Sequence, residues 1–198
     1  VATVLLAAAT VATAWSGYQA SRWNAEATKA TMRGTAARVE STRASDLANS
    51  QAQIDVAVFI QWADAYASGN KLLRQFYFER FRPEFKPAVV AWIATRPLKN
   101  PKAPLTPFAM PEYTSEARAE ADRLETQADA WAATARRNVQ RSTNYVLGVV
   151  LFAAALFFAG MSTKLPSRRL CVAMLTIGAV VFVGTLAWIA ASPVSLSI

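Results

Sequence analysis

Two long stretches near the C-terminal end limit what this chain can fold into. Residues 145–163 and 170–198 contain no Asp, Glu, Lys or Arg. The hydrocarbon core of a bilayer is about 30 Å thick, and a helix needs about 20 apolar residues to cross it. Both stretches reach that length. The sequence therefore predicts an integral membrane protein with spanning helices at 144–163 and 168–191.

A third apolar stretch opens the sequence. Residues 1–15 also lack charge but are shorter, and the first residue is Val1 rather than Met. We expect further residues upstream and a first span over 1–17, which gives about three spans. A cleaved signal peptide is the alternative, because such short apolar stretches precede its cleavage site. The helical pattern runs on through 16–50 without a loop, which favours the retained span.

The sequence AWSGYQASRW, residues 14–23, follows this first stretch. Its aromatic residues fit either a ligand site or a collar at the membrane surface, where Trp and Tyr are enriched. We interpret it as a collar, with Arg22 marking the exit into water. The predicted membrane-interface residues are Trp15, Tyr18, Trp188, Lys164, Arg168 and Arg169.

Small residues repeat along two polar segments, 18–50 and 114–143, at alternating spacings of four and three. This repeat is typical of a coiled-coil seam, and we expect an antiparallel helical stalk that also supports homo-oligomers. The alternative is chance, because alanine is abundant here. The predicted seams are Ser16, Ala20, Trp23, Ala27, Ala30, Gly34, Ala37, Ser41, Ala44 and Ala48, and Ala117, Ala121, Leu124, Ala128, Trp131 and Ala135.

Charges on the two stalk helices are complementary if position 16 lies level with position 143. Exposed ion pairs are weak, about 0.2–1 kcal/mol, but they can select a register. Two separately solvated faces are the alternative. The expected partners are Arg33 with Glu125, Arg38 with Glu120 or Asp122, and Arg43 with Glu116.

Residues 51–113 change character, and we expect a small helical cap at the end of the stalk. Ser68-Gly69-Asn70 predicts a break, and a short helix follows at 87–95. Asp55 and Asp64 are nine residues apart, so on one straight helix they face opposite sides. Five prolines within 97–111 predict an extended connection of the polyproline type.

The cap combines aromatic residues with an excess of basic ones between Lys71 and Lys102. This combination fits docking to an anionic surface or polymer. The alternative, which we favour, is that the aromatic residues form the core of the cap while the basic groups are solvated. The candidate partner-binding residues are Arg80, Arg82, Lys86, Lys99, Phe78 and Phe81.

Composition argues against most chemistry. The chain has no His and one Cys, Cys171 in the last apolar stretch, so we expect no Cys/His metal site, no cofactor and no enzyme activity. The net charge is +8, but much of it flanks the apolar stretches, as in membrane proteins. No nucleic-acid-binding motif is present.

The distribution of basic residues also predicts the orientation in the membrane. The short turn 162–169 contains Lys164, Arg168 and Arg169, whereas the tail after the last span is uncharged. Short basic loops stay in the cytoplasm. We therefore expect the turn 162–169 to be cytoplasmic and the stalk and cap to be extracytoplasmic.

The order of these parts resembles a family of small bacterial inner-membrane proteins of unknown function. The resemblance rests on Trp15-Ser16-Gly17-Tyr18-Gln19-Ala20 and on the paired spans with their basic turn, 144–169. It implies a multi-pass protein of the bacterial inner membrane and no activity. The proline-rich segment and the aromatic cap depart from that pattern.

We therefore expect a non-enzymatic scaffold or accessory subunit that presents its cap to a partner. The alternative is an oligomeric channel or transporter subunit, its pore lined by small and hydroxyl residues. The hydroxyl residues concerned are Thr3, Thr10, Thr13, Thr176 and Thr185.

Overall fold

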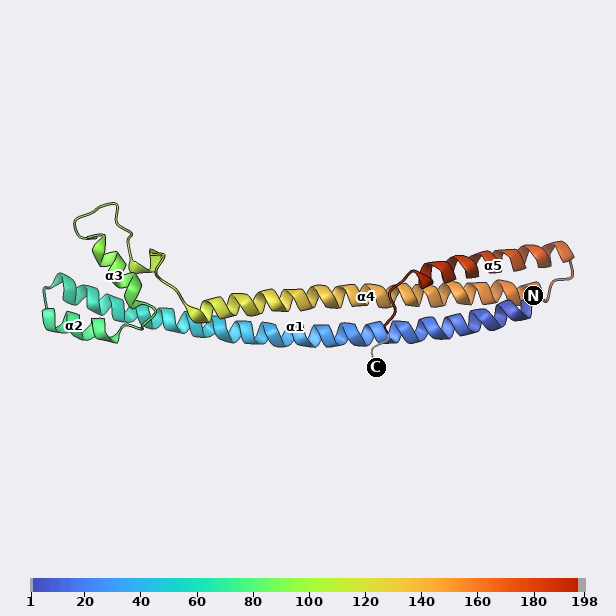
Figure 1. The fold of residues 1–198 in the computed structure, drawn as a ribbon, viewed down its shortest axis with the longest axis horizontal. Helices are drawn as coiled ribbons and strands as arrows, with labels where there is room; N and C mark the ends of the chain where they lie inside the picture. The colour runs from blue at the N-terminus through green and yellow to red at the C-terminus, as the bar shows by residue number, and fades with distance from the viewer. Residues whose placement is uncertain (1, 196–198) are drawn as a thin grey trace. The chain divides into compact units, whose positions relative to one another are not determined.

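The computed structural model describes residues 2–195, and all of its regular elements are helical. This confirms the all-α class (Figure 1). The elements are α1 (Ala2–Ala67), α2 (Lys71–Arg80), α3 (Lys86–Ala94), the 3-10 helix η1 (Pro107–Ala109), α4 (Glu116–Ser162) and α5 (Arg168–Ala190).

The chain divides into two compact units. We call them the terminal unit, Val1–Thr35 with Ala128–Ile198, and the central unit, Ala36–Gln127. Helices α1 and α4 each contribute to both units.

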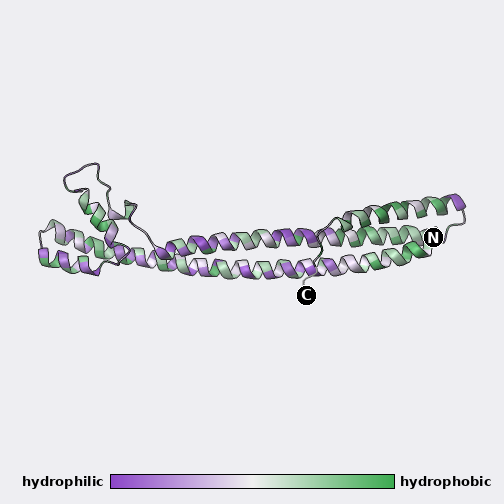
Figure 2. Ribbon diagram, viewed as in Figure 1, coloured by the Kyte–Doolittle hydropathy of each residue, from purple (hydrophilic) through white to green (hydrophobic). Residues whose placement is uncertain are grey.

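Among the described residues, two helices are long and apolar enough to cross a membrane, α4 and α5. They cover the predicted spans 144–163 and 168–191 except for the last residue of each. Figure 2 shows the hydrophobic colouring along α5 and the last part of α4. The start of α1 is helical from Ala2 but is not one of these two helices.

The helices are longer than the expected segments. Helix α1 continues past residue 50 and ends at Ala67, where the predicted break at 68–70 is confirmed. Gly69 has φ of +73°, which glycine adopts without a steric cost. The Asn70 side chain then accepts a hydrogen bond from the Leu73 amide and caps α2. Helix α4 likewise runs without interruption into the apolar segment.

The predicted small-residue positions face inward in both units. All ten positions on α1 are buried except Ala44, which is half-buried. In the terminal unit Ser142 Oγ donates to the Ala20 carbonyl at 2.9 Å, and a Cβ on Gly34 would lie 3.3 Å from Trp131 Cβ. In the central unit Ser41 Oγ donates to the Ala121 carbonyl at 2.9 Å.

The expected charge register is wrong. Within the terminal unit position 16 lies near Gly148 rather than 143, since a Cβ on Gly148 would be 3.7 Å from Ser16 Oγ. The guanidinium of Arg33 lies over the Trp131 ring, 4.9 Å from its centroid. Arg43 pairs with Glu40 on its own helix at 2.7 Å. Exposed ion pairs contribute too little to compete with backbone-close packing of small residues.

Helices α4 and α5 approach closely at Gly178. A Cβ there would lie 3.2 Å from the Ala155 carbonyl oxygen and 3.3 Å from Phe158 Cβ, whereas a Cβ on Gly184 of the same helix meets nothing within 4 Å. The close contact between these two helices therefore depends on the missing side chain at 178.

We expect Gly178→Leu to destabilise the α4–α5 pair by about 1–3 kcal/mol, because the added side chain has no space and must push α4 away. Gly184→Leu is the matched control, with the same helix and the same residue change. Thermal unfolding of the purified protein in detergent, followed by circular dichroism, measures both. Equal melting temperatures for the two variants would contradict the contact at Gly178.

Candidate functional site

The central unit is built around a cluster of aromatic side chains, which we call the aromatic core. Its buried members come from the end of α1, the α2–α3 connection and α3, and they are Phe59, Trp62, Phe81, Phe85, Ala88, Val89 and Trp92. Most of the ring pairs meet edge to face, whereas Phe59 and Trp62 are stacked at 5.8 Å between centroids and Phe85 and Phe108 at 4.8 Å. Such pairs add about 0.5–1.5 kcal/mol beyond the area that they bury.

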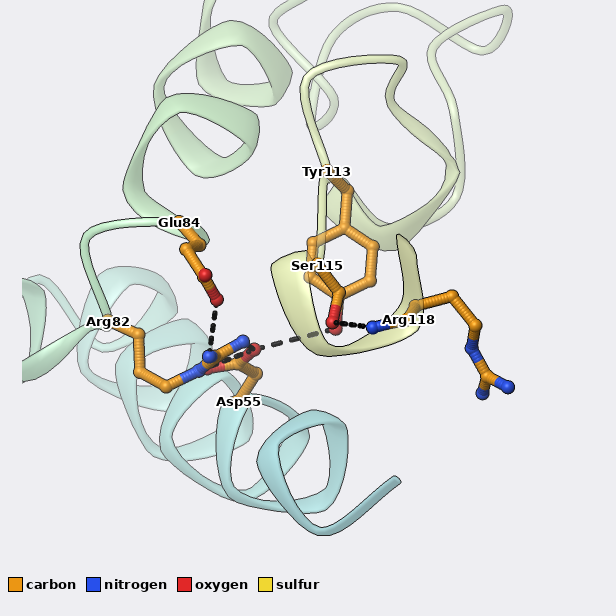
Figure 3. Close-up of polar contacts among 6 residues, drawn as sticks. All are labelled: Asp55, Arg82, Glu84, Tyr113, Ser115 and Arg118. Atoms are coloured by element: carbon orange, nitrogen blue, oxygen red, sulfur yellow. Dashed lines mark hydrogen bonds and ion pairs between the residues drawn. The ribbon is translucent and has the colours of Figure 1, made fainter. Parts of the chain in front are cut away.

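A charged network borders this core (Figure 3). The Asp55 side chain on α1 is 1% exposed, and Arg82 from the α2–α3 connection holds both of its oxygens. Arg82 Nε donates to Asp55 Oδ1 at 3.0 Å and Nη2 donates to Oδ2 at 2.8 Å. Arg82 Nη1 donates to Glu84 at 2.6 Å, and the Tyr113 hydroxyl donates to Asp55 Oδ2 at 3.4 Å.

The network raises the pKa values of two of its members, Arg82 and Tyr113. The hydrogen bond from Arg82 to Asp55 is the main reason that the pKa of the guanidinium is raised. Burial, and then the Asp55 charge, raise the pKa of the Tyr113 hydroxyl. Both groups, which are protonated at neutral pH in any case, therefore keep their protons to higher pH. The arrangement fastens the loops before α3 and before α4 to α1.

The expectation that Asp55 and Asp64 face opposite sides is confirmed, since Asp55 is buried and Asp64 is exposed. The sequence did not identify the partner of Asp55. Arg80 and Arg82 are two residues apart and chemically identical. Only the position of Asp55, 27 residues from Arg82, distinguishes them.

We expect Asp55→Ala to destabilise the central unit by about 3–5 kcal/mol, because it leaves the Arg82 charge largely buried without its main partner. Asp64→Ala removes an exposed carboxylate from the same helix and should change stability by about 0.5 kcal/mol or less. Urea unfolding of the full chain in detergent, followed by tryptophan fluorescence, compares the two. Similar midpoints would show that the ion pair does not stabilise the unit.

The segment between α3 and η1 places basic and apolar side chains on the surface. We call residues 96–105 the basic loop; it contains Arg96, Lys99 and Lys102 and no acidic residue. All three cations are exposed, as are Leu98 at 72% and Leu105 at 94%. Large exposed apolar side chains beside cations are characteristic of contact surfaces.

Hydrogen bonds give the basic loop a defined conformation. The Asn100 amide donates to the Arg96 carbonyl at 3.0 Å, and Asn100 Oδ1 accepts from the Lys102 amide at 3.0 Å. Trp92 Nε1 donates to the Pro104 carbonyl at 2.7 Å. The predicted extended polyproline conformation is therefore wrong here: Asn100 and Trp92 supply partners that fold the segment into turns.

Arg96 has φ of +53° at the start of this loop. The left-handed conformation costs a residue with a Cβ roughly 1–2 kcal/mol. Strained backbone of this kind is concentrated at functional sites.

The six predicted partner-binding residues separate into surface and interior groups. Lys99 and Arg80 are exposed, and the Arg80 guanidinium lies over its own helix neighbour Phe76, 3.4 Å from the ring centroid. Lys86 and Phe78 are half-buried. Phe81 is 3% exposed within the aromatic core, and Arg82 is engaged in the charged network.

Sequence reasoning missed Arg96, Lys102, Leu98 and Leu105 as members of one surface. The available signal was the presence of three cations and two leucines among prolines without any acidic residue. It was interpreted as a connection because prolines dominate the segment.

The predicted interface residues lie on the surface of the terminal unit. All six are exposed: Trp15, Tyr18, Trp188, Lys164, Arg168 and Arg169. Trp23, which we placed on the seam, is buried beside Tyr145 and Ile189.

The end of the described chain is fastened beside Trp23. The indole Nε1 of Trp23 and the Tyr145 hydroxyl both donate to the Pro193 carbonyl, at 3.2 and 3.0 Å. Gln19 exchanges two hydrogen bonds with the Ser195 backbone. These contacts connect α1, α4 and the segment after α5.

Within residues 2–195, no group of three or more His, Cys, Asp or Glu side chains is placed to hold a metal ion. Comparisons of the chain with models of protein families, with curated proteins and with solved structures find no match.

Proposed function

We propose that this protein is a non-enzymatic, membrane-anchored scaffold or accessory subunit whose basic loop docks an anionic partner. The observation that carries the proposal is the basic loop itself. Three exposed cations and two exposed leucines share one hydrogen-bonded loop without an acidic residue. Such a surface attracts anionic groups by charge and gains further affinity by burying the leucines.

The charged network supports this function because it engages Arg82 and none of the cations of the basic loop. Arg82 borders the aromatic core, and its guanidinium donates hydrogen bonds to Asp55 and Glu84. The charge of Arg82 is therefore compensated within the central unit. The cations of the basic loop have no such acidic partner on their own segment. The basic loop therefore presents three exposed cations without a carboxylate on its own segment.

Anchoring by three spans is part of the proposal. Ala9 of α1 is fully buried, and Ala8, Val11 and Ala12 line a groove together with side chains of α4 and α5. The start of α1 thus packs along the two helices that are apolar enough to cross a membrane. We propose that it accompanies them through the bilayer, with the stalk helices continuing beyond the membrane surface.

The buried seams also bear on oligomerisation. The small residues of α1 are covered within the chain itself, so a homo-oligomer has to form through other faces. The large apolar side chains exposed on α4 and α5, which include Val150, Phe157, Val180 and Val183, offer such faces.

The hydroxyl groups considered for a pore favour the scaffold over the channel. Four of the five donate to a backbone carbonyl four residues earlier on their own helix: Thr10, Thr13, Thr176 and Thr185. A hydroxyl bonded in this way has no donor left for a permeating anion and offers only its oxygen lone pairs.

Replacing Arg96, Lys99 and Lys102 together by Gln tests the docking surface. We expect the triple variant to lose its partner, because the loop keeps its turns but loses its positive charge. Cross-linking in native membranes, followed by native gel electrophoresis and mass spectrometry of the captured complex, measures this loss. A matched control replaces three exposed cations outside the cap by Gln: Lys29, Arg136 and Arg137.

The control variant should capture the partner like the wild type. If the loop variant and the control capture equally, the basic loop is not the docking surface. If the wild type captures no partner under these conditions, the scaffold proposal itself fails.

We further propose a bacterial inner-membrane location with the turn 162–169 in the cytoplasm and the cap outside it. The exposed cations Lys164, Arg168 and Arg169 support this orientation. In a Cys171→Ala background, Ser68→Cys should react with a membrane-impermeant thiol reagent in intact cells, because Ser68 is exposed beyond the end of α1. Reaction only after the cells are permeabilised would place the cap in the cytoplasm.

A further inference from the structure

The terminal unit contains an apolar groove of about 600 Å³. It lies between the start of α1, the apolar part of α4 and the end of α5. Its lining is almost entirely hydrocarbon: Ala8, Val11, Ala12, Trp15, Ser16, Phe152, Phe182, Leu186 and Ile189.

One polar group in this lining has no partner. Ser16 is 0% exposed, and its Oγ makes no hydrogen bond. A buried hydroxyl without a partner costs about 1–3 kcal/mol. Ser16 lies at the end of the groove nearest the collar, whereas the lining toward Ala8 is apolar. The groove therefore matches a ligand that is hydrocarbon along most of its length and has an acceptor near one end.

A cation follows the groove along the same face of α1. Ala8, Trp15 and Arg22 are spaced by seven residues, which returns to nearly the same side of a helix about 10 Å further on. Helical side chains lean toward the N-terminus, so the Arg22 side chain leans toward Trp15 and the groove. Tyr18 lies between them, with its ring centroid 6.0 Å from that of Trp15.

The Arg22 guanidinium has a donor to spare. Its Nε is buried and makes no hydrogen bond. The first acidic residue on α1, Glu26, pairs with Lys29 at 2.7 Å. Arg22 follows the lining residues on the same face of α1. Its charge, after the hydrogen bond and charge of Lys29, helps to lower the pKa of Glu26, but its Nε has no hydrogen-bond partner. Guanidinium groups bind phosphate through such charge-assisted donors.

The length of the groove agrees with one leaflet of a bilayer. From Ala8 to Ser16 α1 rises about 12 Å, and half of a hydrocarbon core is about 15 Å. The sequence of environments along α1 is then apolar wall, hydroxyl, aromatic pair and guanidinium. This is the order of acyl chain, ester, glycerol level and phosphate in a membrane lipid.

We propose that the groove binds one glycerophospholipid, with an acyl chain between α1 and α5. The Ser16 hydroxyl donates to an ester carbonyl oxygen, and Arg22 donates to the phosphate. The proposal rests on the membrane location given under the proposed function, but not on the docking role of the cap. It makes the lipid a resident ligand rather than an exchanging neighbour.

Native mass spectrometry of the full chain, released from detergent in the presence of dioleoyl phosphatidylglycerol, tests the proposal. We expect one lipid retained per chain. Val11→Trp should abolish retention, because Val11 is 71% exposed and lines the groove, so the indole fills the space without disturbing the core. Val172→Trp is the matched control, an exposed Val on α5 that lies outside this groove and keeps the lipid.

Arg22→Gln should weaken retention of phosphatidylglycerol by roughly tenfold, as expected for the loss of one charge-assisted contact. Arg136→Gln, an exposed cation on α4, should leave retention unchanged. Dioleoylglycerol, which has the same chains and no phosphate, should bind the wild type about as weakly as phosphatidylglycerol binds Arg22→Gln. If Val11→Trp unfolds, this comparison still decides the question.

Three results would overturn the proposal. They are retention of phosphatidylglycerol by folded Val11→Trp, equal binding of the two lipids, and a lipid-free dimer that Val11→Trp dissociates. The last result would assign the groove to a second copy of the chain. The measurement contains no docking partner, so its outcome is independent of the experiment on the basic loop.

Discussion

The close approach of small side chains between helices is the interaction on which the rest of this structure depends. Helices α1 and α4 meet in each unit through Ala, Ser and Gly, and serine hydroxyls reach the facing backbone directly, as Ser142 does at Ala20 and Ser41 at Ala121. Such a seam buries little area per residue, but it repeats over many turns. Because small side chains make up most of the seam, the helices come close together while the polar residues on their outer faces stay in water.

The central unit is stabilised in a different way, by large aromatic side chains. Short helices α2 and α3 are too small to be stable alone, and they are held by large rings and by one carboxylate with its arginine. The ion pair between Asp55 and Arg82 has a fixed geometry, and it therefore orients the α2–α3 connection on α1. Tyr113 extends the same pair to the segment before α4, so the α2–α3 connection and the segment before α4 share a single anchor, Asp55 on α1.

Features that depend on neighbours in sequence could be predicted, and those that depend on distant neighbours could not. Charge-free length indicated α4 and α5, and the spacing of small residues indicated the inward face of α1. The glycine and asparagine at 69 and 70 indicated the break after α1. By contrast, nothing local in 51–67 marks it as a continuation of α1, and nothing local separates Arg80 from Arg82. The turns of the basic loop depend on Trp92, which is twelve residues from its acceptor.

The hydrogen bonds between Gln19 and Ser195 form only after almost the whole described chain has been synthesised. Gln19 is fully buried, yet its partners lie 176 residues further along the chain. During synthesis, α1 is made with a polar amide on its inner face that has no permanent acceptor until nearly all of the later helices exist. The segment after α5 therefore completes the hydrogen bonding of the inner face of α1 late in folding.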